Sequence, residues 1–168
     1  MPIPGKLVHR AVAVAAALAV AGLGLVGTGC EGPRNYRGYK YKPYTIRGVT
    51  YVPLAPREAI GFVETGIASH YKEGGLFSRG KTSLGEGFSG GAKEAAHKTL
   101  PLPCRIKVTN LKNGRSMILR INDRGPFIDG RILDVTPRVA KDLGFYNAGL
   151  APVQIEVISV GDGRYMIR

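Results

Sequence analysis

Two segments that alternate between apolar and polar residues, joined by a turn signal, constrain the fold of this chain most. Residues 105–109 (RIKVT) have an apolar side chain at every second position, the periodicity of a β-strand with one buried face. Residues 116–121 (SMILRI) follow as a more apolar strand, and Asn113-Gly114 between them favours a two-residue type I′ turn. The sequence therefore predicts an antiparallel hairpin near the middle of the chain.

Further short strand patterns flank this hairpin, at residues 62–71, 131–133 and 153–157. A short helix is predicted after Thr136, because Pro137 suits the first helical position and Gly144 suits the residue past the helix end. The 24 Gly and 11 Pro residues indicate many turns. Many short strands with one or two short helices predict a small mixed or all-β barrel.

The first 30 residues have the pattern of an export signal. Lys6 and Arg10 supply positive charge ahead of residues 11–26, an uncharged apolar stretch. That stretch has the length of a signal-peptide core and is short for a membrane span. We therefore predict a signal peptide over residues 1–29 and an exported protein.

Cys30 follows Gly27-Thr28-Gly29, an order similar to the bacterial lipobox, in which the cysteine becomes the lipidated N-terminus. The lipobox usually has Leu three residues before the cysteine, where this chain has Gly27. We predict lipidation with palmitate at Cys30, which would anchor the protein to a bacterial envelope membrane, facing the periplasm or cell wall. An ordinary signal peptide cut near Gly29 and an uncleaved anchor remain open alternatives.

Residues 30–60 are predicted to be a flexible linker, because Tyr, Lys, Arg, Gly and Pro occur there without a core pattern. Such a segment would connect the membrane anchor to a folded domain over residues 61–160, which is followed by a tail, residues 161–168. Within the linker, residues 36–44 interleave Tyr with Lys and Arg. That composition suits an anionic or sugar surface, and it equally suits a solvated tether.

The basic balance of the chain restricts its partners. The formal net charge is +12, from 24 Lys and Arg against 12 Asp and Glu. Long-range attraction then favours anionic partners, such as phospholipid head groups and the carboxylates of cell-wall peptides. We do not expect nucleic acid as a partner of an exported protein.

The sequence predicts neither a metal site nor a cofactor. The 3 His residues have no Cys pair or HExxH motif beside them, and neither a GxSxG elbow nor a phosphate loop occurs. Of the 2 cysteines, Cys104 opens an alternating apolar run and is predicted to be a buried core residue. A Cys30–Cys104 disulfide remains the alternative.

Two acids stand at positions where catalytic groups tend to lie. Glu86 is in a Gly-rich stretch, residues 73–91, which is predicted to be a long functional loop. Asp123 ends a buried strand at a Gly-Pro turn, beside Arg124. From the residues alone, a turn-stabilising role for Asp123 and a solvated Glu86 remain alternatives. Asp134 is predicted to serve the start of the following helix.

A series of segments, taken together, resembles the rare lipoprotein A (RlpA) family of septal-ring lytic transglycosylases over residues 61–159. The strings AAHKTLPLP at 95–103 and NDRGPF at 122–127 are long and specific. Shorter matches in the same order are GIASHY at 66–71, GE at 85–86, RILD at 131–134 and APV at 151–153.

The resemblance implies a mainly β fold, a six-stranded double-psi β-barrel with one or two short helices. It also implies a lyase that cleaves the β-1,4 MurNAc–GlcNAc bond of peptidoglycan glycan strands, preferably denuded of stem peptides, with a 1,6-anhydro product. Such an enzyme would act in cell-wall remodelling or division, with cell-division or other envelope proteins as candidate partners. A non-catalytic, expansin-like peptidoglycan-binding lipoprotein is the alternative.

The family's acidic pair falls on Glu86 and Asp123, and the resemblance places His97 at the site. We predict Asp123 as the general acid and then base, with Glu86 stabilising positive charge or orienting the sugar; the reverse assignment stays open. His97 and Arg124 are predicted to contact substrate or to hold the acids in place. His70 stands where the family usually has Trp, and we expect no SPOR domain in this chain.

Overall fold

The computed structural model describes residues 39–71, 80–162 and 166–168. The predicted signal peptide, residues 1–29, and the predicted lipidation site, Cys30, lie outside the described residues. Within the described ranges, no helix is long and apolar enough to cross a membrane.

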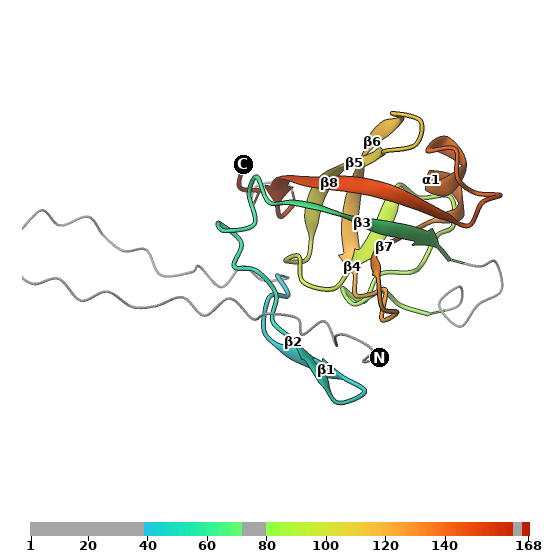
Figure 1. Cartoon of the computed structure of the whole chain (residues 1–168). Helices are drawn as coiled ribbons and strands as arrows, with labels where there is room; N and C mark the ends of the chain where they lie inside the picture. Colours follow the sequence, from blue (N-terminus) through green and yellow to red (C-terminus); the bar gives the residue numbers. More distant parts are fainter. Residues whose placement is uncertain (1–38, 72–79, 163–165) are drawn as a thin grey trace, which may run out of the picture. The chain divides into compact units, whose positions relative to one another are not determined.

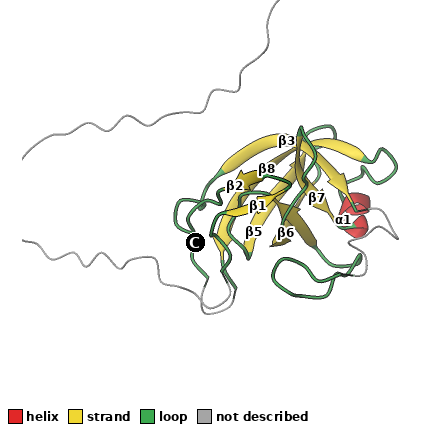
Figure 2. Cartoon of the chain, turned by 90° about the horizontal axis from the view of Figure 1, so that it is seen from below, coloured by secondary structure: helices red, strands yellow, loops and turns green. Residues whose placement is uncertain are grey.

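Six strands form a closed barrel in the order β3-β7-β4-β6-β5-β8 (Figure 1). The β3–β7 and β4–β6 pairs are parallel, and the other neighbouring pairs are antiparallel. The short helix α1 lies to one side of the strands (Figure 2). The elements are β3 (Val63–His70), β4 (Glu94–His97), β5 (Cys104–Asn110), β6 (Ser116–Asp123), β7 (Arg131–Val135), α1 (Pro137–Asp142) and β8 (Leu150–Val160). The predicted mainly β, six-stranded barrel with a short helix is confirmed.

β5 and β6 pair as the predicted antiparallel hairpin, but their connection differs from the predicted two-residue turn. Gly114 has a positive φ of 72°, whereas Asn113 does not. Instead, the side-chain amides of Asn110 and Asn113 each donate a hydrogen bond of 3.0 Å to the carbonyl of Leu143, just past α1. The turn is therefore shaped by a distant helix end, which the local sequence does not indicate.

The barrel core is built from the inward-facing residues of the strands, in which buried and exposed positions alternate. Burial alternates along β5 and along β8, as expected for strands with one face on the core. Cys104 at the start of β5 is a free, fully buried thiol, and burial raises its pKa, in agreement with the predicted core role. The fully buried core residues of these two strands include Cys104, Ile106, Val108, Val153 and Ile155.

Residues 39–60 fold onto the barrel, in contrast to the flexible linker expected over residues 30–60. The segment contains the antiparallel hairpin of β1 (Tyr44–Ile46) and β2 (Val49–Tyr51). The backbones of Lys40 and Leu102 exchange two hydrogen bonds, of 2.8 and 3.1 Å, and Ala59 is fully buried. The prediction failed because Tyr, Pro and Ala supply apolar contact surface here without the periodicity that marks a strand or a helix.

Gly66 lies in β3 at a point where a side chain has no room. A Cβ at this position would lie 2.6 Å from Cγ2 of Ile132. We expect Gly66→Ala to lower the free energy of unfolding by about 1–3 kcal/mol, because overpacking forces the branched Ile132 side chain to shift. Gly87 has open space at its Cβ position, so Gly87→Ala is the control and should change that free energy by less than about 1 kcal/mol. Denaturant unfolding measures both values, and equal effects would contradict the packing argument.

Candidate active site

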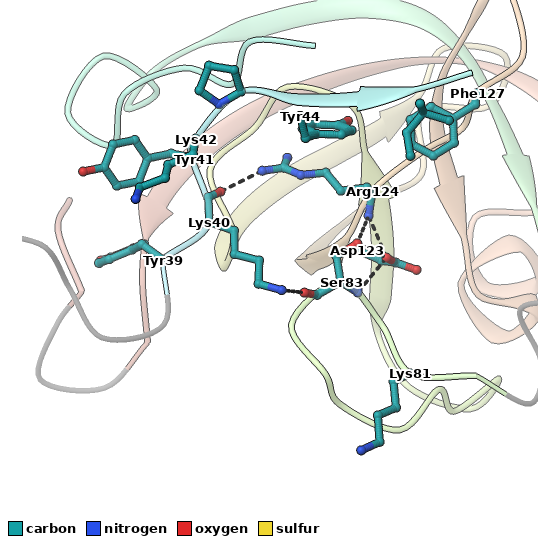
Figure 3. Close-up of a pocket in the computed structure, with 12 residues that line it drawn as sticks. Tyr39, Lys40, Tyr41, Lys42, Tyr44, Lys81, Ser83, Asp123, Arg124 and Phe127 are labelled. Atoms are coloured by element: carbon teal, nitrogen blue, oxygen red, sulfur yellow. Dashed lines mark hydrogen bonds between the residues drawn. The ribbon is translucent and has the colours of Figure 1, made fainter. Parts of the chain in front are cut away.

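Asp123 ends β6 directly after a β-bulge. The β4–β6 register shifts by one residue before Ala96, which pairs with Asp123 and leaves Asn122 as the extra residue. Bulges of this kind re-aim side chains beside many active sites. Oδ1 of Asp123 accepts three hydrogen bonds, from the Ser83 N–H (2.8 Å), the Ser83 hydroxyl (2.6 Å) and the Arg124 N–H (2.7 Å) (Figure 3). The carboxyl is therefore held in one orientation by the loop that contains Ser83.

Ala96 lies between two aspartates. It pairs with Asp123 of β6 on one side and with Asp134 of β7 on the other. Because neighbouring strands are about 4.8 Å apart, the two aspartate backbones lie about 10 Å apart, and directly paired residues share one face of the sheet. Ala96 is 1% exposed but is not part of the barrel's core cluster, and a Cβ on Gly125 would lie 3.9 Å from its methyl group. A single methyl group thus separates the two carboxyl-bearing positions.

Asp134 lies in surroundings that change the pKa of its carboxyl. Burial raises the pKa of its carboxyl, and the hydrogen bond that the Ser69 hydroxyl donates to Oδ1 opposes this increase only in part. Nearby positive charges, including that of Arg131, also lower the pKa without cancelling the effect of burial. The surroundings of Asp134 therefore favour the protonated form of its carboxyl more than water does.

The phenol of Tyr71 lines the same small cavity as Asp134. It follows β3, and its N–H donates to the carbonyl of Val135 at 3.1 Å. Burial raises the pKa of its hydroxyl strongly, and the negative charges of Asp123, Asp134 and Glu94 raise it further. The Tyr71 hydroxyl therefore stays protonated among these carboxyls and can donate a hydrogen bond.

Glu86 has a different environment from Asp134. Its carboxylate accepts two hydrogen bonds from the Arg120 guanidinium (2.6 and 2.8 Å) and one from the Asn122 amide (2.9 Å). The Arg120 hydrogen bonds hold the pKa of Glu86 below its usual value. Arg120 also binds Asp162 at 2.8 Å, so it joins Glu86 to the segment that follows β8. Glu86 is consequently kept ionised and is poorly suited to donate a proton.

His97 is buried, with 2% of its surface exposed, and both ring nitrogens are bonded within the chain. Nδ1 accepts hydrogen bonds from the Thr99 and Leu100 N–H groups, each at 3.1 Å. Because Nδ1 accepts, the ring proton lies on Nε2, which donates to Glu64 at 3.0 Å. His97 therefore holds the turn that follows β4 and binds Glu64. A contact of His97 with substrate or with the acids Glu86 and Asp123 stays a prediction.

Arg124 likewise serves the chain itself. Its Nη1 donates to the carbonyls of Lys98 (3.3 Å) and Leu100, and its Nη2 donates to the carbonyl of Lys40 (2.7 Å). Its guanidinium also lies over the Tyr44 ring, 5.1 Å from the centroid. Arg124 thus joins the N-terminal segment to the loop after β4, immediately beside Asp123.

Two cavities lie on this face and share Arg124 and Phe127 as lining residues. The larger, of about 570 Å³, is lined by Asp123, and the smaller, of about 240 Å³, is lined by Tyr71 and Asp134. In the described part of the chain, no group of three or more His, Cys, Asp or Glu side chains is arranged to hold a metal ion. The arrangement offers two carboxyls in adjoining cavities for acid–base chemistry.

The structure brings Asp123 and Glu86 to the same end of β6 but adds Asp134, which the sequence interpretation had given to the helix start. Asp134 is instead a strand residue, and Thr136 at the start of α1 makes no capping bond with its side chain; it donates to the Ala92 carbonyl at 2.6 Å. The available signal was an acid that follows the apolar pair Ile132-Leu133 within a strand pattern.

Comparisons with known proteins identify the family of this barrel. A double-psi β-barrel family described as lytic transglycolase matches residues 63–155. The endolytic peptidoglycan transglycosylase RlpA of Rickettsia bellii is 46% identical over 142 residues, covering 81% of this chain and 61% of that protein. The protein of the same name from Campylobacter jejuni is 48% identical over 120 residues, covering 71% and 42%. The chain thus spans about three-fifths or less of the length of these relatives.

Among solved structures, a Streptomyces papain inhibitor aligns with a TM-score of 0.47 at 18% sequence identity. The alignment covers 58% of this chain and 96% of the inhibitor.

The ion pair of Glu86 predicts a pH-dependent contribution to stability. Because its pKa is lowered on folding, the stabilisation is present above the ordinary value of 4.5 and is lost as pH falls through the folded-state pKa. We expect Glu86→Gln to lower the free energy of unfolding by about 1 kcal/mol at pH 7, a small value because the pair is partly exposed. The difference from the unmodified protein should close in acid, as measured by urea unfolding at several pH values. Glu58→Gln, at an exposed residue, is the control; a difference that does not change with pH would contradict the assignment.

Proposed function

The chain belongs to the double-psi β-barrel lytic transglycolase family, and from this membership we propose that it is a peptidoglycan lytic transglycosylase. The proposed reaction cleaves the β-1,4 MurNAc–GlcNAc bond of glycan strands, with a preference for denuded strands, and closes a 1,6-anhydro ring. The observation that carries the proposal is the pair Asp123 and Asp134, held on either side of Ala96.

The chemistry needs two proton transfers at one sugar. The leaving glycosidic oxygen must gain a proton as its bond to C1 breaks through an oxocarbenium-like state. The C6 hydroxyl of the same sugar then bonds to C1 and must lose its proton. A protonated carboxyl close to the leaving oxygen and an ionised carboxyl close to the C6 hydroxyl would serve both steps.

We assign the proton donor to Asp134, because burial raises its pKa. Its proton passes to the leaving oxygen, and Asp123 takes the proton of the C6 hydroxyl; exchange with solvent then restores both carboxyls. This modifies the sequence-based hypothesis, in which Asp123 served as acid and base in turn. Glu86, fixed on Arg120, keeps its negative charge near the site and anchors the loop whose Ser83 orients Asp123.

The location of the enzyme is also a proposal. Export by the segment at residues 1–29 and a lipid on Cys30 would hold the barrel at an envelope membrane, within reach of glycan strands. The net charge of +12 supports attraction to anionic lipids and to the acidic wall polymer. Cell-division or other envelope proteins remain candidate partners.

One observation favours a second candidate, a non-catalytic peptidoglycan-binding protein. Glu86, one of the two acids that the sequence interpretation assigned to catalysis, is held in an ion pair with Arg120. If Asp123 and Asp134 did not transfer the two protons, the two cavities would bind glycan strands without cutting them.

The decisive experiment incubates the purified protein with denuded and with intact peptidoglycan and detects anhydro-MurNAc products by mass spectrometry. We expect product from denuded strands, and a rate loss of about 10²–10⁴-fold in both Asp123→Asn and Asp134→Asn, because each removes a proton-transfer group. Glu86→Gln should lose less than about tenfold, since it acts through the loop. Asp129→Asn, at an exposed loop residue, is the matched control.

Each outcome decides between the two candidates. Binding of glycan by the unmodified protein without any anhydro product would favour the non-catalytic candidate. Full activity of Asp134→Asn would refute the assignment of the proton donor while leaving the activity itself established.

The pH profile gives an independent test of Asp134. Activity should fall as pH rises through its raised pKa, because the donor loses its proton. The Ser69 hydrogen bond favours the ionised form, so Ser69→Ala should move this alkaline limb of kcat to higher pH, by about one pH unit or less. Ser116→Ala, at an exposed serine, should leave the limb in place. A shift to lower pH would contradict the proposal.

A further inference from the structure

The basic, tyrosine-rich segment noted in the sequence forms one wall of the larger cavity. We call residues 39–46 the strap. Tyr and Lys residues of the strap line the cavity of about 570 Å³, opposite Ser83, Asp123 and Phe127 (Figure 3). The cavity therefore opens directly beside one of the two aspartates to which we assign proton transfer.

The strap is fixed in place by contacts at several points. The Lys40 backbone pairs with Leu102, and Nη2 of Arg124 donates to the Lys40 carbonyl at 2.7 Å. The Tyr44 hydroxyl donates to the Lys98 carbonyl at 2.7 Å. A wall held by these bonds is preorganised, so a ligand need not order it on binding.

The side chains that line the cavity carry more positive than negative charge. Its described lining residues include the cations Lys40, Lys42, Lys81 and Arg124 against the single acid Asp123. The Lys40 ammonium donates to the carbonyl of Ser83, close to Asp123. An ammonium has three N–H donors, so Lys40 has two more for a ligand. An anionic group on a ligand would therefore be attracted to the strap side of the cavity.

The same lining offers aromatic surface to a ring. Tyr39, Tyr41 and Tyr44 of the strap and Phe127 of the opposite wall contribute rings. A cavity of about 570 Å³ with aromatic walls and a few placed polar groups has the size and character of a small-molecule subsite. Its chemistry thus fits a ring compound that carries a negative charge.

We propose that this cavity is a subsite for a sugar that carries a free carboxylate, bound through Lys40 and Lys42 of the strap. The inference rests on the proposed function, in which the sugar is a MurNAc unit and the anion is its lactyl carboxylate. A stem peptide converts that carboxylate into a neutral amide, and the carboxylates of the peptide itself lie farther from the sugar ring. A peptide-linked unit would therefore lose the ion pair at the lactyl position and add bulk there.

The test uses two free sugars, MurNAc and GlcNAc, which differ in the lactyl ether group. Amide NMR titration of the purified protein measures their affinities. We expect MurNAc to bind several-fold more tightly than GlcNAc, with the difference shrinking in about 0.5 M salt because the Debye length falls. Lys40→Gln and Lys42→Gln should each weaken MurNAc by about two- to fivefold and leave GlcNAc unchanged. Lys112→Gln, at an exposed lysine outside the cavity, is the matched control.

Equal affinity for the two sugars would overturn the proposal, as would a preference for MurNAc that persists unchanged in both strap variants. Binding is measured without turnover, so the result is separate from the activity assay. Anhydro product without a MurNAc preference would refute the subsite alone, and a lysine-dependent preference without product would refute the proposed activity alone.

Discussion

The pairing of β4 with β6 on one side and with β7 on the other is the constraint on which the candidate active site depends. It places Asp123 and Asp134 on either side of Ala96, and a bulge at Asn122 turns Asp123 toward the same face. Because both pairings belong to a closed barrel, neither strand can slide without disrupting the core. The backbone separation of the two carboxyl-bearing residues is therefore a property of the fold, and loops add only the orientation of each side chain.

The surroundings of two nearby acids favour opposite protonation states, the protonated form of Asp134 and the ionised form of Glu86. Partial burial raises the pKa of Asp134, whereas Glu86 is held ionised by the Arg120 guanidinium and the Asn122 amide. Separation of this kind is how one site can hold both a proton donor and a fixed negative charge at a single pH. Asp123 is oriented by Ser83, from the loop that Glu86 anchors.

The sequence predicted what depends on local periodicity and missed what depends on pairing between distant segments. The β5–β6 strands and the buried Cys104 follow from alternation, and the barrel follows from the family resemblance. Asp134 was assigned to the helix start because its partner in the site comes from β6 through β4, a register that local patterns do not reveal. The strap looked like a tether because its packing of Tyr39 on the core and its hydrogen bonds to backbone groups have no strand or helix periodicity. The roles of Asp123 and Glu86 remain predictions.

Arg124 links three stretches of chain, since it follows β6, binds two carbonyls after β4 and holds the carbonyl of Lys40. Lys98 and Lys40 lie outside the barrel's core cluster, and Leu100, which belongs to it, is bound only through its backbone carbonyl. The residues that build the barrel core and those that build the wall of the larger cavity can therefore change independently. A related sequence could keep every core residue and replace Arg124 together with the strap. It would then have a cavity of a different shape on an unchanged barrel.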